Sequence, residues 1–555
     1  MKTKTNNQNG RVHRAKSILL MLFLIIIGNA LMAQIQSAAS GNWSNSATWA
    51  GGVVPGPADD VVINAAHTIT VDVAATINNF TMSTGTLQGS QSLTVNGNMT
   101  LTNGNVPLLG NLNIGGNLTQ SGGTLGTGNG TSTITVGGDF TFSGGNIGSG
   151  SNSKGPITVN GNTQIATGQT KVILERNLIM NGGGSYTATD IFYFGYSGKI
   201  TIPSGTTWTV DLSAPKSINN QYGGLPMIEN LGTMQLNGAS LLNLSIANEV
   251  VLKNAGQVIV NGGELRMSST QNEAGCNYQL AAGSTLNFNK GTTTGLHGDM
   301  ITGVGNWNLI VSGATLNLTG GTFNPGSYTQ SAGSLQGTAD VNIAGDATIS
   351  GGTYNVIGTT DIAGNVTITG GYFDHGAGTR TVNIDGNLSM SGGSSYLGTG
   401  NGTSTITVGG DFTFSGGNIG SGSNSKGPII VNGNTQIANG QTKAILERNL
   451  IMNGGGSYTA TDIFYFGYSG KITVASGTTW TVDLSAPKSI NNQYGGLPMI
   501  ENLGTMQLNG TSLLNLSIAN EVVLKNAGEV IVNGGELRMY STQNEAGCNY
   551  QLAAG

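Results

Sequence analysis

The sequence predicts an all-β protein, a right-handed parallel β-helix with a small N-terminal capping segment. Three observations predict it. Short strands recur with a period of 19 to 24 residues, apolar and polar residues alternate within each strand, and residues 125–283 return almost unchanged as residues 397–555. A repeat of this kind is typical of a solenoid, in which each unit packs only on its neighbours. The two blocks differ at eight positions: Thr158/Ile430, Thr167/Asn439, Val172/Ala444, Ile202/Val474, Pro203/Ala475, Ala239/Thr511, Gln257/Glu529 and Ser268/Tyr540.

The repeating unit consists of two short strands joined by Gly and then Asn or Asp. Alternation within a strand indicates one buried face, which places these side chains inside: Ile134, Val136, Phe140, Phe142, Ile343, Ile349, Ile384 and Leu388. Thr135 and Thr141 should point outward. We expect the corner glycine to adopt positive φ and the Asn or Asp side chains to form ladders from coil to coil. The corner positions are Asn98, Asn117, Asp139, Asn162, Asp346, Asn365, Asn387, Asp411 and Asn434.

An antiparallel array of hairpins is the alternative architecture. Asn96–Gly97 and Asn261–Gly262 are residue pairs that favour two-residue hairpin turns. The longer strands that such hairpins connect are not evident between them, so the parallel β-helix is the preferred prediction.

The N-terminus predicts export. Lys and Arg residues precede an unbroken apolar run at 18–27, and Ala33 suits signal-peptide cleavage. A membrane-spanning helix needs about 20 apolar residues, so a retained anchor is the second interpretation. The predicted organisation is a signal peptide at 1–33, an N-terminal segment and cap at 34–90, and the β-helix at 91–555, with no transmembrane span in the mature chain. Because the second block stops at Gly555, within the repeating pattern, we expect that more chain follows in a complete protein.

The segment after the predicted signal contains tryptophans, a Gly pair and paired aspartates before a strand. This text resembles the start of the G8 domain at Gly41, Trp43, Trp49, Gly51, Gly52, Pro55, Asp59 and Asp60. The resemblance covers about residues 40–85 and implies a β-helix in a secreted or cell-surface protein, in some cases one concerned with polysaccharide. The wording also resembles bacterial surface proteins exported by a type IX route, which normally end in a sorting domain that is absent here. The Asp59–Asp60 pair itself fits a turn better than a metal site or a carboxylate dyad.

The composition argues against nucleic-acid binding. Gly accounts for 92 of 555 residues, charged residues for 8%, and the net charge is −5. A basic surface for nucleic acid is therefore not expected. Cys276 and Cys548 occupy equivalent positions of the two blocks, so in a solenoid they lie too far apart to form a disulfide, and we expect both to be unpaired.

Candidate chemistry is sparse. Lys171, Glu175, Arg176 and Asp190 form the best polar cluster, which a surface ion group explains as well as a lyase site does. Asp374–His375 is interpreted as a loop, and His67 and His297 are isolated. Phe192, Phe194 and Tyr196 should share one face of a strand, leaving Tyr193 outside, where it would either rim the core or stack on a sugar. No catalytic, cofactor-binding or metal-binding residue is assigned, and no cofactor is expected.

Two hypotheses of function remain. The first is a secreted or cell-surface structural, adhesin-like rod without catalysis, whose partners would be extracellular polysaccharide or other surface components. The second is a carbohydrate-binding or polysaccharide-degrading, pectin-lyase-like β-helix. Near-perfect duplication favours the first hypothesis, because a second copy adds reach or avidity but adds little to a single catalytic cleft.

Overall fold

A computed structural model describes residues 34–128, 130–150, 155–244, 248–303, 305, 308–422, 425–516 and 520–553. The predicted signal peptide at 1–33 lies outside the described residues. Within the described part of the chain, no helix is long and apolar enough to cross a membrane.

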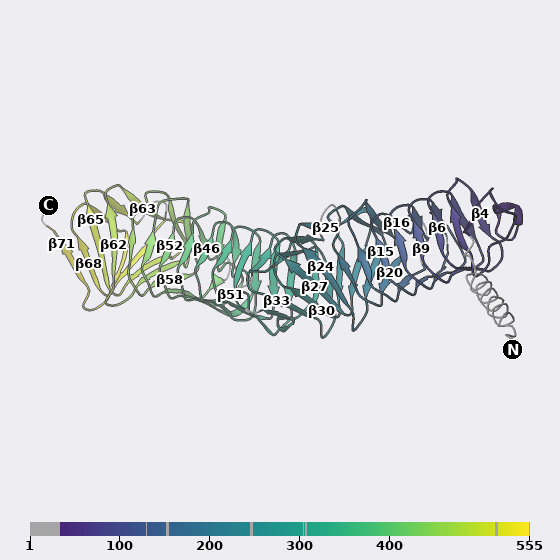
Figure 1. The fold of residues 1–555 in the computed structure, drawn as a ribbon. Coiled ribbons are helices and arrows are strands. Elements are labelled where there is room, and N and C mark those ends of the chain that lie inside the picture. Colours follow the sequence, from purple (N-terminus) through teal and green to yellow (C-terminus); the bar gives the residue numbers. More distant parts are fainter. Residues whose placement is uncertain are drawn as a thin grey trace, which may run out of the picture.

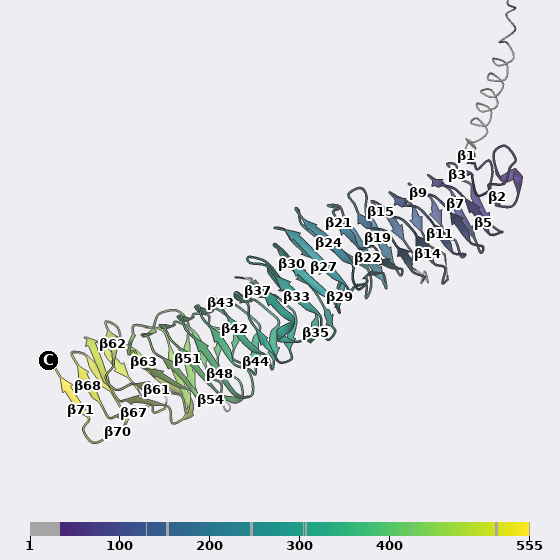
Figure 2. The same ribbon diagram turned by 60° about the horizontal axis from the view of Figure 1, so that its bottom comes forward.

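The chain is a long rod of stacked coils (Figures 1 and 2). It is a parallel β-helix of about 23 turns. The described residues contain 71 strands and two short 3-10 helices, η1 (Ser46–Thr48) and η2 (Gly298–Met300). Neighbouring strands run parallel, as in β11 (Leu112–Ile114) with β14 (Ile134–Val136). The only antiparallel contacts among described residues are two isolated bridges, so the hairpin alternative is wrong.

Each coil contributes one strand to each of three ladders, because most strands pair with the strand three further along the chain. Where the short strand β54 (Ser425–Lys426) is added, the three strands before it pair with the strand four further along. The chain passes from ladder 1 to ladder 2 to ladder 3 and back to ladder 1. Ladder 1 begins with β1 (Gln34–Gln36), β3 (Asp60–Ile63), β6 (Phe80–Met82), β9 (Met99–Leu101), β12 (Leu118–Gln120) and β15 (Phe140–Phe142). Ladder 2 begins with β2 (Gly41–Asn42), β4 (Thr68–Val71), β7 (Thr86–Gly89), β10 (Asn105–Val106), β13 (Thr124–Leu125) and β16 (Gly145–Ile147). Ladder 3 begins with β5 (Ala75–Ile77), β8 (Leu93–Val95), β11, β14 and β17 (Ile157–Val159).

The alternation of apolar and polar residues sets which side chains are inside. All eight residues predicted for the inward stack are buried, whereas Thr135 and Thr141 are partly exposed. Phe140 lies above Leu118 and below Thr163 in ladder 1, so like positions stack from coil to coil. One continuous apolar core therefore runs along the rod.

The Asn and Asp side chains form the predicted ladders of side-chain hydrogen bonds along a corner, which are distinct from the three strand ladders. Oδ1 of Asn98 accepts a hydrogen bond from the backbone N–H of Asn117 at 2.8 Å, and Oδ1 of Asn117 accepts from Asp139 N–H at 2.8 Å. A second ladder runs from Asp346 through Asn365, Asn387 and Asp411 to Asn434. The prediction that the corner glycines adopt positive φ is wrong: glycines with positive φ occur elsewhere in the chain, but Gly138 is not one of them. A Cβ at Gly138 would overlap Asn117 Oδ1, so glycine is needed for space.

The N-terminal end is closed by a short non-repeating stretch. Trp43 and Trp49 are almost fully buried, and their rings meet edge to face at 4.8 Å. Trp49 Nε1 donates to Trp43 O at 2.8 Å. Strands of segment 34–90 pair in the same ladders as those of segment 91–555.

The second block enters the rod one ladder later than the first. Strand β24 (Thr207–Leu212) belongs to ladder 1, whereas its copy β62 (Thr479–Leu484) belongs to ladder 2. Likewise β25 (Lys216–Gly224) lies in ladder 2 and its copy β63 (Lys488–Gly496) in ladder 3. The pairings therefore place the two blocks twelve coils and one ladder apart.

The ladders wind around the rod, and this winding offsets the change of ladder. In Figure 1, β25 and β63 both lie along the upper edge of the rod. In both views β24 and β62 lie at matching positions across its width. Equivalent surfaces of the two blocks consequently face the same side.

Candidate functional site

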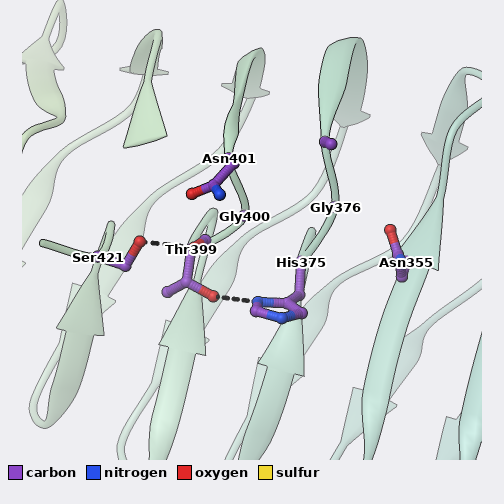
Figure 3. Close-up of a pocket in the computed structure, with 8 residues that line it drawn as sticks. Asn355, His375, Gly376, Thr399, Gly400, Asn401 and Ser421 are labelled. Carbon is purple, nitrogen blue, oxygen red and sulfur yellow. Dashed lines mark hydrogen bonds between the residues drawn. The ribbon is translucent and has the colours of Figure 1, made fainter. Parts of the chain in front are cut away.

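A shallow depression of about 460 Å³ lies beside the ends of four successive ladder 3 strands. These strands are β44 (Thr353–Val356), β47 (Gly371–Phe373), β50 (Ser395–Leu397) and β53 (Gly417–Ile419). Figure 3 shows side chains from these coils lined up across the depression: Asn355, His375, Thr399, Asn401 and Ser421. Because each ladder strand ends at the same corner, residues about 22 apart in sequence become neighbours.

His375 is held in place by its own neighbours. Its Nδ1 lies 2.8 Å from Thr399 Oγ1, and Ser421 Oγ donates to Thr399 O at 2.6 Å (Figure 3). The ring of Tyr372 lies 4.7 Å from the imidazole and stacks on Tyr396 at 4.5 Å. Burial, and then the charge of Arg380, hold the pKa of His375 below its usual value, so the ring is neutral at pH 7.

Beneath the depression lies a fully buried ion cluster. Asp374 contacts Arg380 at 3.1 Å and Arg448 at 3.6 Å, and it accepts a short hydrogen bond from Ser404 Oγ. Burial raises the pKa of Asp374, and the two guanidinium groups partly offset that effect. Asp374 has φ of 60°, a conformation that costs a non-glycine residue about 1–3 kcal/mol. The cluster joins the segment before the second block to Arg448 within it.

The first block has a comparable depression with different walls. Thr127 and Gly128, the counterparts of Thr399 and Gly400, line a hollow of about 580 Å³ together with Pro107 and Leu109. Its buried arginine, Arg176, has no carboxylate partner among the described residues and instead donates to the carbonyls of Gly126, Ser132 and Gly155. The imidazole and the tyrosine pair therefore occur at only one of these two related hollows.

The structure divides the predicted cluster of Lys171, Glu175, Arg176 and Asp190: Lys171 and Asp190 form a pair, Arg176 binds backbone carbonyls, and Glu175 lies half-buried at a corner. Lys171 Nζ lies 2.5 Å from Asp190 Oδ1, and burial lowers the pKa of this fully buried lysine. Burial also lowers the pKa of Arg176, to about 10. The interpretation as a surface ion group is wrong for these two cations, because both lie inside the rod.

The remaining sequence candidates have structural roles. Asp59 Oδ2 accepts from Gly56 N–H at 2.8 Å, which is the predicted local turn. Asp60, in β3, instead accepts at Oδ1 from the side-chain amides of Asn78 and Asn79 in the next coil. His67 contacts Ser37 Oγ at 2.9 Å. His297 Nδ1 lies 3.4 Å from Asp299.

Both cysteines are free, as predicted. Burial raises the pKa of the Cys276 thiol to about 11. Among the described residues, no group of three or more His, Cys, Asp or Glu side chains is arranged to hold a metal ion.

Three outward tyrosines form what we call the tyrosine platform: Tyr193, Tyr196 and Tyr222 in the first block. Tyr193 and Tyr196 belong to β22 (Phe192–Tyr196), and Tyr222 belongs to β25. The Tyr222 ring lies 6.3 Å from Tyr193 and 6.4 Å from Tyr196. The second block repeats the platform as Tyr465, Tyr468 and Tyr494, with ring separations of 6.3 and 6.0 Å.

Tyr196 departs from the predicted alternation. It was expected to share the inward face of Phe192 and Phe194, but its φ of 53° turns it outward and leaves it 37% exposed. The register between β22 and β25 shifts at this point, because β25 carries extra residues around Tyr222. Alternation alone cannot reveal such a bulge, so the sequence predicted one outward tyrosine where the structure has three.

No protein-family model, curated protein or solved structure matches this chain.

Proposed function

We propose that this protein is exported and acts as a secreted or cell-surface, adhesin-like rod that binds without catalysing a reaction. The observation that carries the proposal is the repetition of one surface on the same side of a long β-helix (Figures 1 and 2). Two equal weak sites on a stiff support raise the affinity for an extended partner without any new contact. A copied block serves this purpose directly.

The charged groups are consistent with a structural use. Lys171 with Asp190, Asp374 with Arg448, and Glu229 with Lys199 and Lys253 form ion pairs between coils, and Asp374 also pairs with Arg380 in its own coil. The resemblance to the G8 domain and to type IX-exported surface proteins, together with the signal-like residues 1–33, supports export. Extracellular polysaccharide is the partner that best fits a surface with few charged residues and many hydroxyl, amide and phenol groups.

The test is incubation of the purified protein with neutral and acidic polysaccharides, with and without Ca²⁺. Binding without new reducing ends or unsaturated products is the expected result. Product formation would contradict the proposal. Export is tested separately by mass spectrometry of the mature N-terminus, which should follow Ala33.

The second candidate is a polysaccharide-degrading β-helix, favoured by the depression that holds His375. A neutral imidazole beside amides, hydroxyls and stacked tyrosines could orient a sugar and accept a proton. If products form, His375→Ala should abolish them, whereas replacement of Leu109 by Ala at the related hollow should not.

A further inference from the structure

We propose that the two tyrosine platforms are equivalent sugar-binding sites that engage one polysaccharide chain at two points. This inference rests on the proposed function and names the residues and the ligand class. Each site would hold the apolar face of a sugar ring against the exposed tyrosine rings.

The phenol groups of the platform are available to a ligand. Buried tyrosines elsewhere in the rod use their hydroxyls internally: Tyr278 donates to Asn272 at 2.7 Å and Tyr328 donates to Gln330 at 2.6 Å. Among the described residues, the hydroxyls of Tyr193, Tyr196 and Tyr222 make no such bond. An aromatic ring with a free polar tip suits a partner that is part apolar and part hydroxyl.

The backbone is shaped to present these rings. A Cβ at Gly150 would lie 2.7 Å from the Tyr196 ring, and a Cβ at Gly195 would overlap Tyr222. Gly422 and Gly467 have the same relation to Tyr468 and Tyr494. Glycines thus make room for the rings in both copies. Tyr222 and Tyr494 are each 43% exposed, so the rings do not serve the core.

An unpartnered carboxamide beside each platform favours a ligand that carries hydroxyl groups. Asn219 pairs with Tyr193 across the two strands, and its buried Oδ1 has no hydrogen-bond partner among the described residues. Asn491 repeats this arrangement beside Tyr465. A carboxamide next to an aromatic ring can bond a ring hydroxyl after a small rotation.

The spacing of the sites selects a long ligand with a repeating structure. The platforms face the same side of the rod, because β25 and β63 lie along the same edge (Figure 1). Twelve coils and one ladder at ~4.8 Å per coil put them about 60 Å apart. A polysaccharide presents the same unit again at that distance, whereas a small molecule can occupy only one platform at a time.

The first test is affinity electrophoresis of the full chain in gels that contain dextran, xylan, mannan, galactan or polygalacturonate. We expect at least one polysaccharide to retard the wild type, and the double variant Y222S/Y494S to migrate freely in that gel. Y540S is the matched control: it removes an exposed tyrosine outside the platforms and restores the serine of the first block, so retardation should persist. Equal thermal midpoints by circular dichroism establish that the variants are folded.

The second test separates two-point binding from single-site binding. Apparent Kd is measured for the retarding polysaccharide and for its tetrasaccharide, which is too short to reach both platforms. We expect the polymer to bind the wild type ~100-fold more tightly than the tetrasaccharide. Y222S or Y494S alone should abolish that difference and leave tetrasaccharide affinity nearly unchanged.

Four results would overturn the proposal. They are no retardation in any gel, equal retardation of the double variant, an unchanged polymer preference in the single variants, and a wild-type dimer in sedimentation that Y222S dissociates. The last would identify a second copy of this chain as the occupant. Product formation would instead contradict the absence of catalysis, so the two proposals fail on different readouts.

Discussion

At the scale of single residues, the interior is built by aromatic side chains that meet from coil to coil. Phe142 stacks with Phe140 at 5.7 Å and meets Phe192, two coils further on, edge to face at 6.5 Å. The neighbouring residue Thr141 points out and packs against nothing inside. The two positions differ by one step along the strand and belong to opposite surfaces.

Replacing Phe142 by Ala should therefore lower the free energy of unfolding by about 3–5 kcal/mol, because it removes a buried ring and leaves a cavity. Thr141→Ala is the control and should change stability by less than about 0.5 kcal/mol. Urea unfolding followed by circular dichroism measures both. Equal effects of the two substitutions would show that the register of this strand is wrong.

The residue scale also shows what a sequence can and cannot predict. The period of two identified Phe142 and its partners, because strand alternation is a local property. It could not place Lys171 and Arg176 inside, because the carbonyls and the carboxylate that hold them come from other coils. Nor could it find the outward turn at Tyr196, which depends on extra residues in the strand above.

At the scale of elements, the corners between ladders carry the polar structure of the rod. The corner after β47 contains Asp374. Its carboxylate contacts both Arg380 in β48 (Gly378–Ile384) and Arg448, which follows β57 (Lys443–Leu446). Asp374 is thus the only acid that bonds to both buried guanidinium groups among the described residues.

Asp374→Asn should lower the free energy of unfolding by about 3–5 kcal/mol, because it leaves two buried cations without a counter-charge. The matched control is Asp361→Asn, since Asp361 is exposed and accepts one hydrogen bond from Asn383. Denaturant titration of both variants at pH 7 tests this. A loss below about 1 kcal/mol for D374N would mean that backbone carbonyls alone satisfy the guanidinium groups.

A second element-scale feature is an external row of charges across ladder strands. Glu229 lies 2.8 Å from Lys199 and 3.3 Å from Lys253, and Glu501 repeats these contacts with Lys471 and Lys525. Burial tends to raise the pKa of Glu229, but the two lysines outweigh it and hold the pKa below its usual value. The same balance lowers the pKa of Glu501.

Because the pKa of Glu229 is lowered on folding, the free energy of unfolding depends on pH. The stabilisation is fully present above the unfolded-state value of 4.5 and is lost as pH falls through the lower folded-state pKa. The double variant E229Q/E501Q should therefore lose less free energy of unfolding between pH 7 and pH 3 than the wild type does. Unfolding curves at the two pH values measure it, and an identical loss in both proteins would contradict the assignment.

At the scale of the whole molecule, the parallel stack sets both length and stiffness. About 23 turns at ~4.8 Å per turn make a rod of about 110 Å. Small-angle scattering should give a radius of gyration near 33 Å, whereas a compact protein of this size has one of about 24 Å. A measured value close to the compact figure would show that the rod folds back on itself in solution.

The period and the duplication in the sequence predicted this architecture, because a solenoid repeats its local contacts. The direction in which each block faces was beyond such a prediction. It depends on how far the ladders wind over twelve coils, which accumulates from small strand twists that no single residue encodes.

The change of ladder between the two blocks has a consequence for how such a chain can grow. Since the same strand of the block takes its place on one side of a coil in the first copy and on the next side in the second, the smallest added length is one side, about seven residues, and not a full coil. The second block lies twelve whole coils and one further side beyond the first. The winding of the rod compensates for that extra side, so the surface of the second block faces the same way as that of the first (Figures 1 and 2). A third copy inserted with the same length would advance by the same step. Its tyrosines would then stand in a row with the first two, so the protein could lengthen its reach while keeping one contact edge.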